Sequence, residues 1–229
     1  MSGTARATVG EFLGSAGLAA VVIGSGIAAQ RLSPSDVGLQ LFENASATAL
    51  GLAVLILVFA SVSGAHFNPV VTVVDILLHR RSWSTAAIYL PSQVLGCIAG
   101  AVLANLMFAE PAVSWSTTDR SGWHLLLAEA VATAGLILVI FALVRTGRSQ
   151  LAAPAVGAYI GAAYFFTSST SFANPAITIG RMFTDTFAGI APVSALPFIS
   201  AQLVGAAVGW GLVRVLFPVA VPEPVVAHG

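Results

Sequence analysis

Two Asn-Pro pairs lie in otherwise apolar stretches of the chain. Asn68 and Pro69 belong to SGAHFNPVVT, whereas Asn174 and Pro175 belong to SFANPAITIGR. Proline is well tolerated at the first position of a helix, because the amide hydrogen that it lacks would have no partner there. The asparagine amide before it offers N–H donors to a passing oxygen atom. Each pair therefore predicts a helix that starts beside a polar group.

The two segments that begin with these pairs, 68–79 and 174–185, are too short to cross a bilayer, which takes about 20 residues. We expect half-helices in re-entrant loops, where irregular backbone must be buried or must line a wet cavity. Each helix start carries roughly half a positive charge, so two starts that meet near the midplane repel cations, including protons. This design suits a pore for small neutral molecules that carry hydroxyl groups.

The composition places these half-helices in a membrane protein. The 229 residues are 57% hydrophobic and 8% charged, with a mean hydropathy of +0.93, whereas soluble domains carry about 25% charged residues. The net charge is zero, which gives no sign of a nucleic-acid partner. The single cysteine, Cys97, excludes an intramolecular disulfide and a cysteine-rich metal site. We expect the lipid bilayer as a partner, and no metal or cofactor.

Long apolar segments separate the half-helices. We expect a single channel domain over 1–229, with residues 218–229 as a proline-rich tail outside the helices. The fifth segment is the shortest of the expected spans. The six expected transmembrane helices lie near 8–30, 44–63, 84–108, 123–144, 151–167 and 194–217.

The two halves of the chain share one polar pattern. The pattern E-x-x-x-[ST]-A-G begins at Glu11 in the first span and at Glu129 in the fourth. The pattern Q-x-x-G-x-x-x-G begins at Gln93 in the third span and at Gln202 in the sixth, and its small residues let helices pack closely. Because each copy has three spans, the two copies insert with opposite orientations. The copies cover about 8–108 and 123–217.

Arginine placement predicts the orientation in the cell membrane. All nine basic residues are arginines, and positive residues gather on the cytoplasmic side. Six of them fall on one side of the expected topology and three on the other, which places both termini of this multi-pass protein in the cytoplasm. The six are Arg6, Arg80, Arg81, Arg145, Arg148 and Arg214, and the three are Arg31, Arg120 and Arg181.

These patterns resemble the aquaporin and aquaglyceroporin family of major intrinsic proteins over nearly the whole chain. SGAHFNPVVT is close to the family's first box, and Asn174, Pro175 and Ala176 match its second. The resemblance implies an all-α membrane fold, with six transmembrane helices and two re-entrant half-helices. It also implies a homotetramer with one pore in each subunit. We expect a bacterial member in the inner membrane.

The resemblance also assigns roles to single residues. Glu11 and Glu129 match glutamates that brace the re-entrant loops, with a proton-coupling carboxylate as the alternative. His66 matches a position that faces the cytoplasmic half of the pore, or else braces the loop. Val70 replaces the alanine of the first box, and we expect a small local shift from its two extra methyl groups. Asp75 is unusual on the first half-helix and could pair with His79, Arg80 or Arg81.

The chain departs from the family at the selectivity filter. Most members carry an arginine after the second box, where this chain has Ile177. Counting back from the asparagines gives Thr48, with Leu50 as a rival, and also Ala162 and Ser171. The sequence therefore predicts a filter that is uncharged, lacks the arginine and is wide enough for solutes larger than water. Its residues are Thr48, Ala162, Ser171 and Ile177.

Arg181 lies four residues after Ile177, one helical turn farther along. It could lend positive potential to the pore mouth in place of the missing arginine. Alternatively, it pairs with Asp185 at the i+4 position or extends to the membrane interface.

We interpret the protein as a passive channel for small uncharged solutes, not an enzyme. The candidates are water, glycerol-like polyols and metalloid hydroxides such as arsenous acid, since FANPA followed by an aliphatic residue looks like a bacterial subgroup associated with metalloids. The alternative is an ion- or proton-coupled secondary transporter, which also uses inverted repeats and broken helices. Linear flux favours the channel, whereas saturable, gradient-coupled uptake favours the transporter.

Overall fold

The computed structural model describes residues 3–218, and all of the regular structure in that range is helical. It confirms the all-α architecture that the sequence predicts. The long helices are α1 (Gly3–Leu32), α2 (Val37–Phe59), α4 (Trp83–Met107), α5 (Trp123–Arg145), α6 (Ala152–Phe166) and α8 (Pro192–Leu216), and the short ones are α3 (Pro69–Leu77), α7 (Pro175–Gly180) and the 3-10 turns Ser149–Leu151 and Arg181–Phe183.

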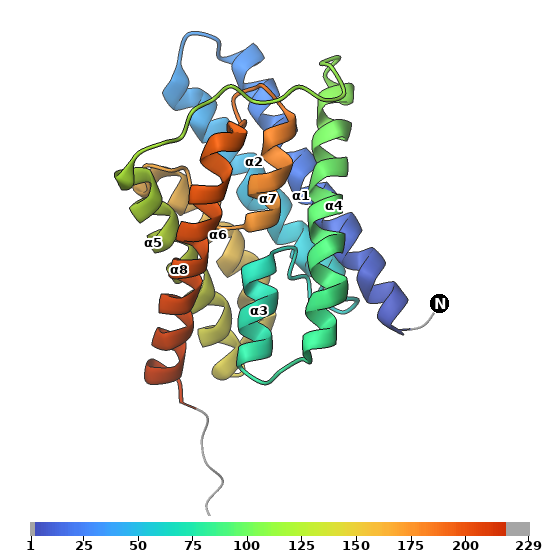
Figure 1. Ribbon diagram of the computed structural model, residues 1–229, viewed down its shortest axis with the longest axis vertical. Helices are drawn as coiled ribbons and strands as arrows, with labels where there is room; N and C mark the ends of the chain where they lie inside the picture. Colours follow the sequence, from blue (N-terminus) through green and yellow to red (C-terminus); the bar gives the residue numbers. More distant parts are fainter. Residues whose placement is uncertain (1–2, 219–229) are drawn as a thin grey trace, which may run out of the picture.

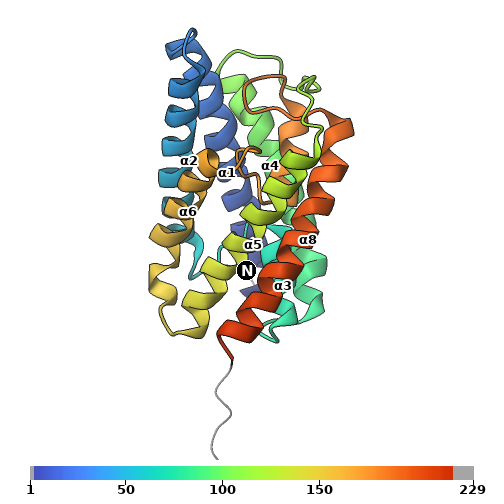
Figure 2. The same cartoon turned by 90° about the vertical axis from the view of Figure 1, so that its left-hand side faces the viewer.

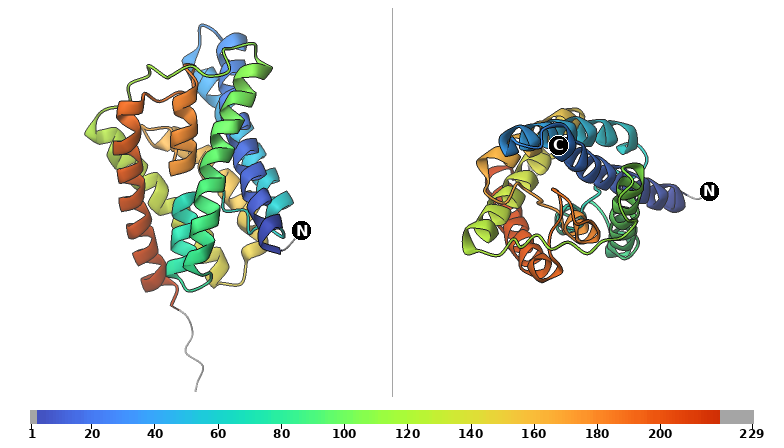
Figure 3. Two further views of the ribbon diagram at one scale, coloured as in Figure 1. Left: turned by 45° about the vertical axis from the view of Figure 1, so that its right-hand side comes forward. Right: turned by 90° about the horizontal axis from the view of Figure 1, so that it is seen from above.

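The two short helices lie inside a ring of long ones. Figure 1 shows α3 in the lower half of the molecule and α7 in the upper half, so that each reaches only partway along the long axis. Seen from above, the long helices surround them (Figure 3). The half-helices therefore enter from opposite ends and start near the middle of the bundle.

Equivalent helix pairs form the contacts of each half. Helix α1 packs most extensively against α4, and α5 packs most extensively against α8. Glycine allows this close approach, because a Cβ atom at Gly96 would overlap the carbonyl oxygen of Phe12, and one at Gly205 would overlap that of Ala130. These are the first glycines of the repeated Q-x-x-G pattern, so the sequence repeat is also a packing repeat.

Several bounds differ from the expected ones. Helix α2 begins at Val37, seven residues earlier than expected, because the Asp36 side chain accepts the Leu39 amide hydrogen and caps the helix. Helix α7 ends at Gly180, and the chain continues as a 3-10 turn that contains Arg181. Apart from Pro218, the expected tail over 218–229 lies outside the described residues.

Within 3–218, five helices are long and apolar enough to cross a membrane by length and composition. The exception among the six expected spans is α6, which has 15 residues and follows a 3-10 turn. Figure 2 shows α6 beside α2 at one side of the bundle, α8 at the other, and α5 crossing between them.

Candidate functional site

The two half-helix starts are joined by the asparagine side chains. The Asn68 side-chain oxygen accepts the Val70 amide hydrogen at 3.1 Å, and its amide nitrogen donates to the Ala173 carbonyl at 2.8 Å. Asn174 caps α7 in the same way and donates to the Phe67 carbonyl at 2.8 Å. Since each side-chain amide has two N–H groups, each asparagine keeps one donor beyond this cross-link.

Buried glutamates hold the loops that lead to these starts. The Glu11 carboxylate accepts the backbone amides of His66 and Phe67 at 3.0 and 2.7 Å. The Glu129 carboxylate accepts those of Phe172 and Ala173 at 2.8 and 2.9 Å. Each carboxylate also accepts a hydrogen bond from a glutamine side chain at 2.7 Å, Glu11 from Gln93 and Glu129 from Gln202. These donors satisfy charges that would otherwise be costly to bury.

The loop backbone is unusual at matching positions. Ala65 and Phe67 precede Asn68 with φ angles of 52° and 49°, and Ser171 and Ala173 precede Asn174 with φ angles of 52° and 48°. Non-glycine residues rarely adopt this left-handed conformation, and it persists where the surroundings hold it in place. The amide hydrogen bonds to the two glutamates provide this restraint.

A cavity of about 880 Å³ runs past both asparagines. At one end, which we name the Arg80 mouth, it is lined by Asp75, Arg80 and Arg81. At the other, the Arg181 mouth, it is lined by Phe172, Ile177 and Arg181. Most of the wall between them is apolar. The polar groups are therefore concentrated at the half-helix starts and at the two mouths.

Thr48 lies in the wall near the Arg181 mouth. It is 2% exposed, and its hydroxyl lies 3.2 Å from the Tyr164 hydroxyl, which also lines the cavity. The rival position, Leu50, is 71% exposed on the outside of the bundle. The structure thus favours Thr48 and adds an aromatic residue that the sequence interpretation missed.

The prediction of Ala162 as a filter residue is wrong. Ala162 is exposed on the outer face of α6 and does not line the cavity. The inner face carries Val156, Ile160 and Tyr164, spaced one helical turn apart. Counting back from Asn174 ignored which face of the helix each residue occupies. The four-residue spacing of Val156, Ile160 and Tyr164 could have identified Tyr164 as an inward-facing residue.

Ile177 and Ser171 both line the cavity, as the sequence interpretation expects of filter residues. Ile177 is 4% exposed, and its backbone amide donates to the Asn174 side chain. The Ser171 hydroxyl is buried and has no hydrogen-bond partner among residues 3–218. Val70, by contrast, packs in an apolar cluster with Ile137 and Phe141 and is absent from the cavity wall.

Arg181 neither pairs with Asp185 nor extends to the interface. It is 3% exposed, its Nε donates to the Ala188 carbonyl, and its guanidinium carbon lies 3.4 Å from the centre of the Phe172 ring. Asp185 instead accepts the backbone amide and the hydroxyl of Thr117. The alternative in which Arg181 is a surface residue is therefore wrong, because the 3-10 turn directs it inward.

The model of the major intrinsic protein family matches residues 1–172, which include the first box and both buried glutamates. This chain belongs to the major intrinsic protein family. Its members are channels, and this one is a membrane channel for water and other small neutral solutes.

Similar proteins agree with this assignment. The aquaglyceroporin AqpS of Rhizobium meliloti is 45% identical over 218 residues, which cover 95% of this chain and 92% of that protein. Aquaporin-2 of Rattus norvegicus is 34% identical over 142 residues, which cover 60% of this chain and 51% of that protein. The X-ray structure of the aquaglyceroporin from Plasmodium falciparum has a TM-score of 0.73 at 22% identity, covering 92% of this chain and 95% of that one, and so shows the fold.

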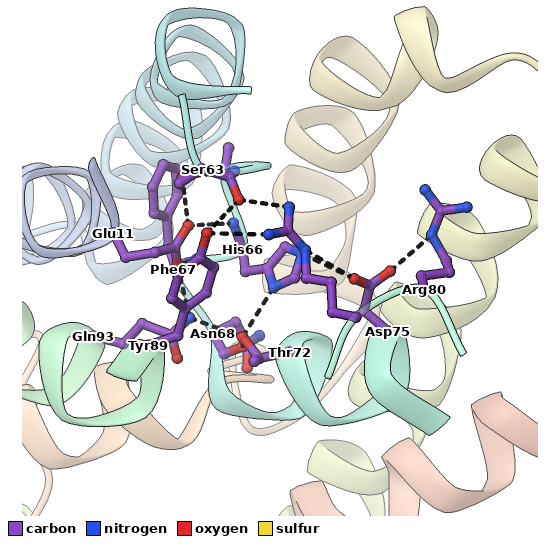
Figure 4. A network of polar contacts seen from close by, with 12 residues as sticks. Glu11, Ser63, His66, Phe67, Asn68, Thr72, Asp75, Arg80, Tyr89 and Gln93 are labelled. Carbon is purple, nitrogen blue, oxygen red and sulfur yellow. Dashed lines mark hydrogen bonds and ion pairs between the residues drawn. The ribbon is translucent and has the colours of Figure 1, made fainter. Parts of the chain in front are cut away.

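The Arg80 mouth of this channel carries an ion-paired cluster around one carboxylate. The Asp75 carboxylate lies 2.8 Å from Arg80 Nε, 3.2 Å from Arg81 Nε and 3.7 Å from His66 Nε2. His66 Nδ1 lies 3.0 Å from the Thr72 hydroxyl. Figure 4 shows Asp75 between His66 and Arg80. Of the three partners that the sequence offered for Asp75, the arginines are the ones in contact.

Proposed function

We propose that this channel passes neutral polyhydroxylated solutes of at least glycerol size, including metalloid trihydroxides such as arsenous acid, in addition to water. The observation that carries the proposal is Ile177, an uncharged and buried side chain in the cavity wall beside the second half-helix start. An arginine there would extend a long cation across the path. An isoleucine leaves that volume to the solute.

The proposed filter consists of Thr48, Tyr164, Ser171 and Ile177. A solute with several hydroxyls would exchange hydrogen bonds with the Thr48–Tyr164 hydroxyl pair. It would then meet the remaining N–H donor of each asparagine at the half-helix starts. Because such a pore replaces part of the hydration shell stepwise, it favours hydroxylated solutes over apolar ones.

The resemblance to AqpS, which is called an aquaglyceroporin, supports a solute of this size. We further propose that Glu11 and Glu129 brace the re-entrant loops, and that His66 lines the Arg80 mouth. The arginine distribution supports a cell-membrane orientation with both termini, and hence the Arg80 mouth, in the cytoplasm. We also propose a homotetramer with one pore per subunit, which cross-linking in native membranes would test.

The test is stopped-flow light scattering on proteoliposomes challenged separately with an impermeant osmolyte, glycerol and arsenous acid. Protein-free liposomes give the background. We expect all three challenges to produce flux above background, rising linearly with the glycerol and arsenous acid gradients. Water flux alone would refute the proposal. Saturation at low concentration with dependence on an ion gradient would contradict a channel mechanism.

A further inference from the structure

Two arginines contact one aromatic ring at the Arg181 mouth. The guanidinium carbon of Arg181 lies 3.4 Å from the centre of the Phe172 ring, and that of Arg120 lies 5.0 Å from it. Each arginine donates through Nε to a neighbouring backbone carbonyl, of Ala188 or of Gly189. The terminal nitrogens of both residues form no hydrogen bond within 3–218.

The described residues provide no carboxylate that pairs with either arginine. Asp185 accepts donors from Thr117. Hydrogen bonds from Ser121 and Ser194 hold the pKa of Asp119 below its usual range. Its carboxylate is therefore charged, but it accepts these two serine hydroxyls and does not pair with either arginine. The Glu129 carboxylate is occupied by Phe172, Ala173 and Gln202.

An unpaired buried cation is costly, and such groups are ordinarily paired with an opposite charge. Arg181 is 3% exposed, lines the cavity and lies close to a second cation. Ser171, adjacent in sequence to Phe172, lines the same cavity, and its buried hydroxyl has no partner among residues 3–218. Cation–π contact with Phe172 offsets part of the cost but supplies no counter-charge.

We propose that Arg181 and Arg120 form a binding site for a tetrahedral oxyanion at the Arg181 mouth. Guanidinium groups present paired donors that match the oxygens of such an anion. Arg181 contacts the anion through its terminal nitrogens in the cavity, and Arg120, 5.0 Å from the centre of the Phe172 ring, adds attraction through its charge. Because the site lies in the solute path, a bound oxyanion slows the flux of neutral solutes. The inhibition can be measured on water flux alone, so its test does not depend on whether the channel also passes the larger solutes proposed above.

The probes are sodium sulfate and sodium phosphate, each compared with sodium chloride at equal ionic strength and osmolarity. Water flux is measured in proteoliposomes with the salt on both sides, and sulfate binding to the purified detergent-solubilised protein is measured by calorimetry. The variants are Arg181→Met, Arg120→Met and Arg181→Lys, with Arg31→Met as the matched control, because Arg31 is exposed and paired with Glu110. For each variant, water flux in sulfate or phosphate is compared with water flux of the same variant in chloride.

We expect sulfate or phosphate to slow native water flux several-fold in a saturable manner, while chloride does not. Arg181→Met should weaken sulfate binding by about tenfold or more, Arg120→Met by less and Arg181→Lys least of the three, since lysine keeps the charge but lacks the paired donors. Arg31→Met should bind as the native protein does.

Three results would overturn the site. The first is that the native protein does not bind either oxyanion. The second is equal inhibition by chloride at matched ionic strength, which would indicate screening. The third is unchanged binding in both methionine variants. If Arg181→Met does not fold, Arg120→Met decides the question, because Arg120 lies in the loop between α4 and α5.

Discussion

The two mouths of the pore are built from equivalent positions of the repeat but carry different side chains. One mouth has an imidazole and a carboxylate where the other has an aromatic ring and a guanidinium. His66 and Asp75 stand two residues before and seven after Asn68, and Phe172 and Arg181 stand at the same offsets from Asn174. In each half these two side chains contact one another, as an imidazole and a carboxylate at 3.7 Å or as a ring and a guanidinium at 3.4 Å. The scaffold is therefore duplicated, while the charge at each mouth is not.

The difference shows which parts of the repeat are constrained. The glutamate and the asparagine of each half occupy matching places because they hydrogen-bond the backbone of the re-entrant loops, and the glutamine of each half donates to that glutamate. The mouth residues do not accept the loop amides next to the half-helix starts, and can diverge. At the Arg80 mouth the Asp75 carboxylate pairs with two arginines, whereas at the Arg181 mouth two arginines lack a carboxylate partner among residues 3–218.

The largest expected effect comes from removing a glutamate that accepts the amides of a re-entrant loop, a feature that both halves share. Glu129→Gln places an NH2 group against the amide hydrogens of Phe172 and Ala173, so at least one charge-assisted hydrogen bond is lost and donors face each other. Because hydrogen bonds to charged groups contribute about 1.5–3 kcal/mol each, we expect a loss of about 3 kcal/mol or more. The measurement is thermal unfolding in detergent, together with water flux.

Glu11→Gln should behave alike, because Glu11 makes the equivalent contacts in the first half. The control is Glu110→Gln, which affects an exposed ion pair with Arg31 and should change stability by less than about 1 kcal/mol. If the unfolding temperature of Glu129→Gln equalled that of the native protein, the bracing role would be wrong.

An intermediate effect should follow from making the two mouths alike. Asp75→Asn removes the carboxylate that lies between Arg80 and Arg81 and so leaves two uncompensated arginines. We expect stronger inhibition of water flux by sulfate than in the native channel, since a second oxyanion-binding mouth is created. Native-like inhibition with intact folding would show that uncompensated arginines alone do not create such a site.

The smallest expected effect concerns the wall between Thr48 and Ile177. Tyr164→Phe removes one hydroxyl that bonds to Thr48 and should change glycerol flux by about fivefold or less, since one neutral hydrogen bond contributes about 1 kcal/mol. Ala162→Leu lies on the exposed outer face of α6 and is the matched control without a pore effect. A larger flux change in Ala162→Leu than in Tyr164→Phe would restore Ala162 as the wall residue.

Motifs that cap their own helix or occur twice were predictable from the sequence. The Asn-Pro pairs act locally on the helices that they begin, and the glutamates and close-packing glycines stood out because each pattern appears in both halves, while the bracing role of the glutamates followed from the family resemblance. Positions set by helix phase or by an irregular turn were not. Counting residues placed Ala162 in the wall, while the periodicity of α6 places Tyr164 there. The inward turn of Arg181 depends on a 3-10 segment that the sequence does not signal.

The measurement that tests the account most directly is the ratio of glycerol to water permeability in proteoliposomes that contain Ile177→Arg. We predict that the ratio falls by about tenfold or more relative to the native channel, because the guanidinium would occupy the volume that Ile177 leaves open. Ile177→Val, which keeps the position small and apolar, should leave the ratio close to native. An unchanged ratio in the arginine variant, with water flux intact, would show that another constriction selects the solute.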